Sequence, residues 1–101
     1  MAGAGSVYEF EWDPTKARAK QQKHELGFEE AATVFLDAGG LCVYDTEHGD
    51  TENLWLTLGF ASTGRLLVVC HTFRDLSRRR IAVRIFSCRK ATGKEAQSYG
   101  S

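Results

Sequence analysis

The chain has 101 residues, of which 43% are hydrophobic and 26% are charged, and this suits one globular domain with a modest core. No apolar run approaches the roughly 20 residues of a membrane-spanning helix, and the first residues lack the basic and apolar regions of a secretion signal. The formal net charge is zero, yet residues 1–50 carry four Lys or Arg against ten Asp or Glu, whereas residues 51–101 carry nine against three. The basic second half could attract an anion such as a nucleic-acid phosphate, or the two halves could neutralise each other across the fold.

The N-terminal part of the chain predicts one strand followed by two helices. We expect a disordered leader over residues 1–7 and a single domain over residues 8–101. Residues 8–12 alternate aromatic and acidic side chains, as a half-buried strand does. An Asp-Pro pair then favours the start of a helix, which we expect over residues 14–25. A second helix is predicted over residues 28–35, where apolar residues recur at helical spacing.

The remainder of the chain predicts mainly strands. Residues 37–50 are typical of a loop that could hold a short strand at residues 41–44. Strands are predicted at residues 52–60, 65–73 and 79–88, and their short connections favour an antiparallel meander. The sequence TGKE near the C-terminus matches a capping box and predicts a short final helix. The order β-α-α-β-β-β-α predicts an α+β fold, in which helices pack on one face of a mostly antiparallel sheet.

Arginines stand beside apolar residues in the predicted strands, where a purely structural strand has no need of them. Side chains alternate between the two faces of a strand, so the aliphatic residues of the last strand are expected to face the helices and Arg84 to face the other way. In the preceding strand Arg65 and His71 share a face. If the mixed faces of the two strands coincide, Arg65, His71 and Arg84 lie on one surface of the sheet, with Arg74 and Arg89 flanking it at strand ends.

Such a surface would suit phosphate chemistry. Guanidinium groups bind phosphate oxygens in a two-pronged fashion and stabilise the negative charge that develops at a scissile phosphodiester. RNA can be cut without a metal ion because its own 2′-OH attacks the adjacent phosphate, and the protein then supplies a base and an acid. His71 is a candidate for proton transfer, since an imidazole titrates near neutrality. His24, His48 and His71 are scattered in the sequence, so we expect no metal site.

Four segments of the chain, FEWDPTKARA, KHELGFEEAATVFLD, GRLLVVCHTFR and RIFSCRKATGKEAQSY, resemble the BrnT family of bacterial toxins over about residues 8–99. The resemblance implies a RelE-like fold, a cytoplasmic ribonuclease that arrests translation, and no cofactor. It also implies a BrnA-type antitoxin with a ribbon-helix-helix DNA-binding part. Toxin and antitoxin of this family assemble into a complex that reaches operator DNA through the antitoxin and represses its own operon, and a homodimer or a toxin–antitoxin heterotetramer would both be compatible with the resemblance.

The residues that match the family segments define the site that we predict. The predicted catalytic residues are His71, Arg84 and Arg89. The predicted RNA phosphate-binding residues are Lys16, Lys23, His24, Arg65, Arg74 and Tyr99. The chain departs from the family at Leu54, where an Arg is common, and in a longer connection that adds residues 77–80. The loss of an Arg leaves an alternative open, in which the chain is a catalytically inactive interaction module that binds an acidic protein partner.

Overall fold

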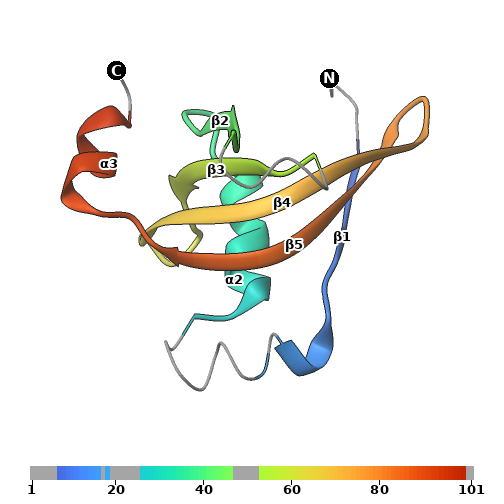
Figure 1. The fold of residues 1–101 in the computed structure, drawn as a ribbon, viewed down its shortest axis with the longest axis horizontal. Helices are drawn as coiled ribbons and strands as arrows, with labels where there is room; N and C mark the ends of the chain where they lie inside the picture. Colours follow the sequence, from blue (N-terminus) through green and yellow to red (C-terminus); the bar gives the residue numbers. More distant parts are fainter. Residues whose placement is uncertain (1–6, 17, 19–25, 47–52, 100–101) are drawn as a thin grey trace.

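The structure, a computed structural model, describes residues 7–16, 18, 26–46 and 53–99. It confirms the predicted α+β class, because five strands form one sheet in the order β1-β5-β4-β3-β2 and short helices accompany it (Figure 1). None of the helices in the described part is long and apolar enough to cross a membrane. The elements are β1 Val7–Glu11, α2 Phe28–Ala32, the 3-10 helix η1 Thr33–Leu36, β2 Leu41–Tyr44, β3 Trp55–Phe60, β4 Leu66–Ser77, β5 Arg80–Lys90 and α3 Gly93–Ser98.

The sheet is mixed rather than purely antiparallel. Strands β2 to β5 pair antiparallel with their neighbours, which confirms the predicted meander and the short strand in the 37–50 segment. Strand β1 pairs parallel with β5, so that Tyr8 lies opposite Ile81 and Phe10 opposite Val83. A parallel pairing needs a long connection, and most of the chain lies between these two strands.

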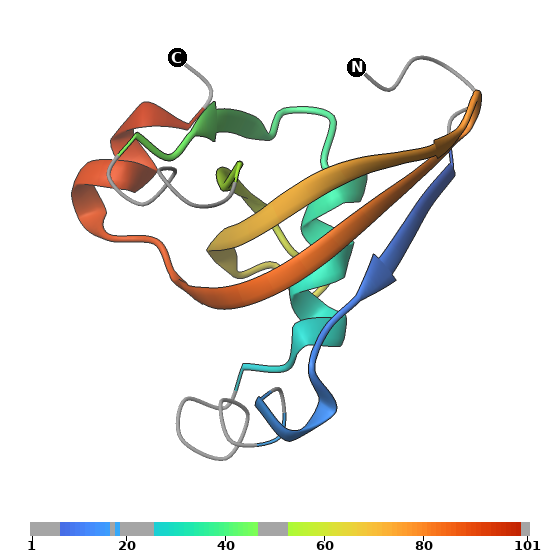
Figure 2. The ribbon, with the colours of Figure 1, turned by 45° about the vertical axis from the view of Figure 1, so that its right-hand side comes forward.

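The core lies between the sheet and the helical segment that crosses one of its faces (Figures 1 and 2). The apolar stripe predicted for residues 28–35 is confirmed, since its members belong to or pack against one apolar cluster. The helix tightens into a 3-10 turn at Thr33, and this brings Val34 into the core as well. Each large aliphatic or aromatic side chain buried there contributes roughly 1.5–3 kcal/mol to stability. The most deeply buried apolar side chains are Phe28, Val34, Leu67, Val69, Val83 and Ile85.

The start of the first helix follows the prediction. Residues 14–16 and 18 are helical, and the Asp13 carboxylate accepts hydrogen bonds from the backbone N–H groups of Thr15 and Lys16 at 2.9 and 3.3 Å. Asp13 therefore caps this helix, as its position before a proline indicated. The predicted phosphate-binding residues Lys23 and His24 lie outside the described residues.

Two predicted boundaries are wrong. Val7, which was expected in the leader, is the first residue of β1, and its backbone N–H donates to the carbonyl of Arg79 at 2.6 Å. The connection expected to follow Phe73 is strand, and only Arg78 and Arg79 form the turn between β4 and β5. Charged side chains do not end a strand by themselves, because the backbone ladder continues wherever a partner strand runs alongside.

The register of β4 against β5 decides which of their side chains share a face, and it includes a β-bulge. The two strands pair Cys70 with Ser87 but His71 with Ile85, so Phe86 has no partner in the register. The extra residue lies in β5, so the alternation of β4 is unbroken and His71 shares a face with the buried Leu67 and Val69. His71 therefore lies with Ile85 on the face that α2 and η1 cover, and not with Arg84.

Candidate active site on the open sheet face

The sheet face turned away from α2 brings a carboxylate and two guanidinium groups together. Glu11 of β1 and Thr72 of β4 are the direct neighbours of Arg84 on β5, so the three residues form one row across three strands. Arg74 follows Thr72 by two residues on the same face of β4, and its Nη2 lies 3.9 Å from Oε1 of Glu11. The Arg74 side chain is 65% exposed and that of Glu11 is 40% exposed, so both can reach a bound molecule.

An aromatic ring completes this surface. Arg84 Cζ lies 5.7 Å from the centroid of the Phe86 ring and Lys16 Nζ lies 5.9 Å from it, within the range of cation–π attraction. Among the described residues, no carboxylate forms an ion pair with Arg84. We call this surface the arginine face and define it as Glu11, Lys16, Thr72, Arg74, Arg84 and Phe86.

The predicted site residues did not include three members of the arginine face, which are Glu11, Thr72 and Phe86. Glu11 belongs to the alternating pattern of the first strand, which indicates that it points away from the core but not which strand lies beside it. Alternation along the last strand places Phe86 on the face of Arg84, as the structure shows, but it does not single out this ring as part of a site. The positions of Glu11 and Thr72 beside Arg84 depend on strand pairings that no local pattern specifies.

Arg89, a predicted catalytic residue, lies on the same sheet face but is already paired. Its Nη1 and Nη2 donate to the two carboxylate oxygens of Glu95, each at 2.7 Å. These hydrogen bonds lower the pKa of Glu95 to about 2. Glu95 also accepts from the backbone N–H of Thr92 in the predicted capping box, which is confirmed. Arg89 thus ties β5 to the start of α3.

Arg65 lies on the helix side of the sheet. Its Nε donates to Oε2 of Glu30 on α2 at 2.8 Å, and its Nη2 binds the other oxygen of the same carboxylate. Thr63 donates to Glu30 as well, and the hydrogen bonds from Arg65 hold the pKa of Glu30 below its usual range. This pair fastens the turn before β4 to the helix and separates Arg65 from Arg84.

Tyr99 also lies away from the arginine face. Its hydroxyl donates to Oδ2 of Asp37 at 2.5 Å, and its ring packs edge-on against Phe60 with the centroids 4.9 Å apart. The hydrogen bond raises the pKa of Tyr99 and lowers the pKa of Asp37. A carboxylate next to the hydroxyl repels a phosphate, so this position favours the docking of α3 over the binding of RNA.

His71 is fully buried beneath the helices. Its Nε2 is hydrogen-bonded to Oγ1 of Thr57 at 2.6 Å, its Nδ1 has no hydrogen-bond partner, and the rings of Phe35 and Phe73 pack edge-on against it. Burial lowers the pKa of His71 to about 4, so the imidazole is neutral near pH 7. The prediction that His71 and Arg65 share a surface with Arg84 is wrong, because the register pairs His71 with Ile85 and Thr72 with Arg84, so the face of β4 that carries His71 is the one packed against the helices.

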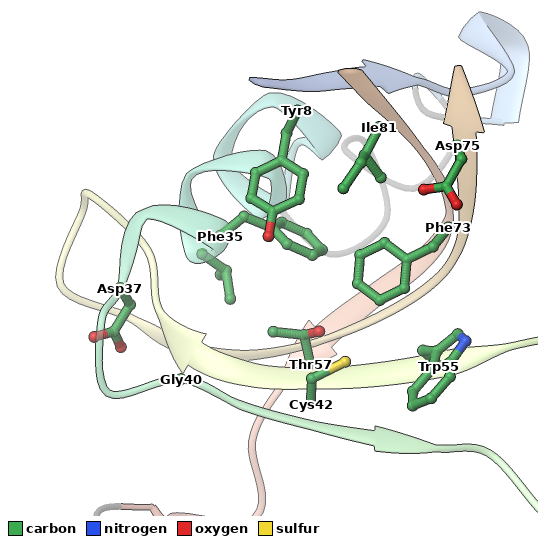
Figure 3. Close-up of a pocket in the computed structure, with 11 residues that line it drawn as sticks. Tyr8, Phe35, Asp37, Gly40, Cys42, Trp55, Thr57, Phe73, Asp75 and Ile81 are labelled. Atoms are coloured by element: carbon green, nitrogen blue, oxygen red, sulfur yellow. The ribbon is translucent and has the colours of Figure 1, made fainter. Parts of the chain in front are cut away.

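A pocket of about 510 Å³ opens on the helix side of the sheet (Figure 3). Its walls are mostly apolar, with Tyr8 and Phe35 above and Phe73 at one side, and the carboxylates of Asp37 and Asp75 stand at its margins. No Lys or Arg lines the described part of this pocket. The pocket therefore disfavours a phosphate, in contrast to the arginine face.

Ion pairs between the two halves of the chain explain part of the charge pattern. Arg65–Glu30, Arg74–Glu11 and Arg80–Glu9 each join the basic second half to the acidic first half. The expectation of mutual neutralisation thus holds for these arginines, although the Arg74 contact is loose. No group of three or more His, Cys, Asp or Glu side chains in the described residues could hold a metal ion.

Comparison with known proteins adds one finding. The family model described as "Ribonuclease toxin, BrnT, of type II toxin-antitoxin system" matches residues 12–95. The match extends from the residue after β1 into α3 and includes every member of the arginine face except Glu11, which lies one residue outside it. No curated protein matches the chain.

Proposed function

Because the chain belongs to the BrnT family of ribonuclease toxins of type II toxin–antitoxin systems, we propose that it cleaves RNA at the arginine face without a metal ion. The observation that carries this proposal is the row formed by Glu11 and Arg84, with Arg74 3.9 Å from the same carboxylate. A base and two cations on one exposed surface are what the attack of a 2′-OH on its own phosphodiester requires.

The proposed reaction uses groups of the arginine face in distinct roles. Arg84 and Arg74 donate to the non-bridging oxygens of the scissile phosphate and stabilise its additional negative charge in the transition state. Glu11 accepts the proton of the 2′-OH, whose oxygen then attacks phosphorus. The bond to the 5′-oxygen breaks, the upstream fragment keeps a 2′,3′-cyclic phosphate, and the leaving oxygen takes a proton from Lys16 or from water. The Phe86 ring offers a surface on which a neighbouring base can stack.

The remaining predicted site residues receive other roles in this proposal. Arg89 becomes a flanking phosphate contact, available when Glu95 releases it. We give Arg65 and Tyr99 structural roles because their partners are carboxylates. His71 takes no part in proton transfer, since it is buried on the other side of the sheet.

Family membership and the sequence resemblance support the biological side of the proposal. We propose that the chain acts in the cytoplasm, that RNA cleavage inhibits translation, and that the fold is RelE-like. We also propose that a BrnA-type ribbon-helix-helix antitoxin neutralises it, and that the complex represses its own operon through contacts of the antitoxin with operator DNA.

The proposal is tested by Arg84→Ala beside Lys90→Ala. Lys90 is an exposed cation on the same strand, but it lies opposite Leu67 on the helix side of the sheet. In the presence of EDTA, the wild-type chain should cut RNA and leave 2′,3′-cyclic phosphate ends. Arg84→Ala should slow cleavage by about 10²–10³-fold and abolish growth arrest on expression, whereas Lys90→Ala should behave as the wild type. Equal rates of RNA cleavage by Arg84→Ala and the wild type would rule out the arginine face as the active site.

A second candidate function follows from the paired arginines. Arg65, Arg80 and Arg89 are each held by a carboxylate of the chain itself, which leaves fewer arginines for a catalytic site. This favours an interaction module without catalysis, in which Arg84 and its neighbours on the open sheet face would bind an acidic protein partner. The non-catalytic function would be supported if the wild-type chain, freed of antitoxin, leaves RNA intact and its expression does not arrest growth.

A further inference from the structure

The hairpin that joins β4 to β5 ends in two adjacent arginines. Ser77 pairs with Arg80, so Arg78 and Arg79 form the whole turn. Two-residue hairpin turns favour Asn, Asp and Gly, whose backbones adopt the required angles easily. Nothing in the turn itself calls for arginine at both positions.

Both turn side chains are exposed and differ from the neighbouring arginines in their contacts. Arg80 is bound to Glu9, through Nε–Oε2 and Nη2–Oε1 distances of 2.5 and 3.0 Å. Within the described part of the chain, no carboxylate is paired with Arg78 or Arg79. The turn thus carries two positive charges that no carboxylate of the described residues pairs with, in a molecule whose formal net charge is zero.

The backbone of the turn is tied down, so these charges occupy a defined place. The carbonyl of Arg79 accepts the hydrogen bond from Val7, which attaches the turn to the start of β1. The hairpin reaches the end of the molecule opposite α3, as two views show (Figures 1 and 2). A backbone that is already fixed loses little conformational entropy when the turn binds a ligand.

The turn lies in line with the arginine face. Arg80 and Arg84 are four residues apart on β5 and their side chains are on the same sheet face, with a separation of about 13 Å at the rise of a strand. An extended RNA strand that runs along β5 from Arg84 therefore meets the turn after a few nucleotides. The Glu9 carboxylate lies along this path, but Arg80 neutralises it.

We propose that Arg78 and Arg79 form a second phosphate-binding point for single-stranded RNA, which makes the protein prefer substrates long enough to span from Arg84 to the turn. This inference rests on the proposed function, since it takes Arg84 as the place of cleavage. Two guanidinium forks suit consecutive phosphates, and an unpaired strand has the flexibility to follow a curved sheet. The turn then contributes to affinity and to the choice of substrate length, whereas the arginine face performs the chemistry.

The test measures binding of fluorescent 2′-O-methyl oligouridylates, which cannot be cleaved, by anisotropy at several salt concentrations. The double variant Arg78→Ser/Arg79→Ser is compared with the wild type and with Lys90→Ser/Lys94→Ser, which removes the same charge from two exposed positions outside the turn. For an oligonucleotide of roughly 16 residues, we expect the turn variant to bind about tenfold more weakly and its salt slope to fall by about 1.4, that is, 0.7 for each lost contact. For a dinucleotide, whose single phosphate cannot contact Arg84 and the turn at the same time, the turn variant should bind as the wild type does.

Several results would overturn the inference. Equal losses for the turn variant and the lysine variant would show that only overall charge matters. Unchanged binding of the long oligonucleotide by the turn variant would show that the turn does not contact RNA. If the turn variant at the same time bound a polyglutamate peptide more weakly than the wild type does, the turn would instead be a binding site for an acidic protein partner. Matching thermal unfolding curves establish that the variants are folded. Failure of the proposed function is distinguishable, because it appears as absent cleavage by the wild-type chain and does not alter these binding measurements.

Discussion

Glu11 and Arg84 acquire their relation only through pairing between strands that are more than seventy residues apart in the chain. Each residue alone has an ordinary explanation, as an exposed acid or an exposed cation. Side by side, with Arg74 close to the same carboxylate, they provide a base and its cations on one surface. The proposed chemistry therefore belongs to a pair of residues and not to either one.

Glu11→Gln tests the proposed base at this scale. The amide keeps the shape of the side chain but cannot accept the proton, so cleavage should fall by about 10²–10⁴-fold. Binding of uncleavable RNA should be unchanged or tighter, because a negative charge has been removed from the surface. Glu9→Gln, on the same face of the same strand, serves as the control and should retain cleavage. A parallel loss of cleavage and binding in Glu11→Gln would indicate a structural role instead.

His71 gives a prediction about stability and pH. Its ordinary pKa is 6.5 and its pKa in the folded protein is about 4, so the unfolded chain binds a proton in this interval before the folded one does. The free energy of unfolding should therefore fall as the pH is lowered from about 6.5 to 4, by roughly 3 kcal/mol in total. Urea titrations at several pH values measure this. In His71→Leu the fall should largely disappear between about pH 6.5 and 5, whereas below about pH 5 the lowered pKa values of Glu30 and Glu95 make both proteins less stable. An unaltered pH dependence above about pH 5 in that variant would contradict the assignment.

At the scale of elements, close packing of β3 against η1 fixes the distance between the sheet and the helices. A Cβ at Gly59 would lie 2.9 Å from Cγ1 of Val34, a core side chain, and 3.4 Å from its carbonyl oxygen. The absence of a side chain at Gly59 thus allows this approach. At Gly93, by contrast, an added Cβ meets nothing within 4 Å.

Gly59→Ala should lower the free energy of unfolding by about 1–3 kcal/mol, because the buried neighbour has little room to move. Gly93→Ala, at the start of α3, should change it by less than about 1 kcal/mol, and the helix propensity of alanine favours a small gain. Thermal or urea unfolding monitored by circular dichroism compares the two. Equal stability of both variants would show that η1 can shift away from the sheet at little cost.

At the scale of the whole molecule, charge distribution matters more than net charge. The formal net charge is zero and the pI is about 6.8, yet the arginine face and the turn at Arg78 and Arg79 concentrate positive charge beside carboxylates that are already paired. Guanidinium groups stay charged at every physiological pH. We therefore expect the affinity for RNA to depend on the arginines of the arginine face and the turn, and not on the net charge of the protein as it changes with pH.

The affinity for an uncleavable oligonucleotide should change by less than about threefold between pH 7.5 and pH 9 at constant ionic strength, although the protein becomes more negative overall. Raising the salt concentration at fixed pH should weaken binding strongly. Anisotropy titrations measure both. An affinity that declines tenfold or more in parallel with net charge would contradict a site built from arginines.

The sequence by itself determined the elements and the chemical types. Periodicity predicted the first strand, the apolar stripe on the helix and the meander, and the capping box at Thr92 was readable because caps depend on neighbours in the chain. Resemblance to known toxin segments indicated the family that the comparison then established. Only the tertiary structure decided which residues meet. The parallel pairing of β1 placed Glu11 beside Arg84, and the register of β4 against β5 placed His71 opposite Ile85 on the buried face, because strand register and pairing arise from packing over the whole sheet and no local pattern encodes them.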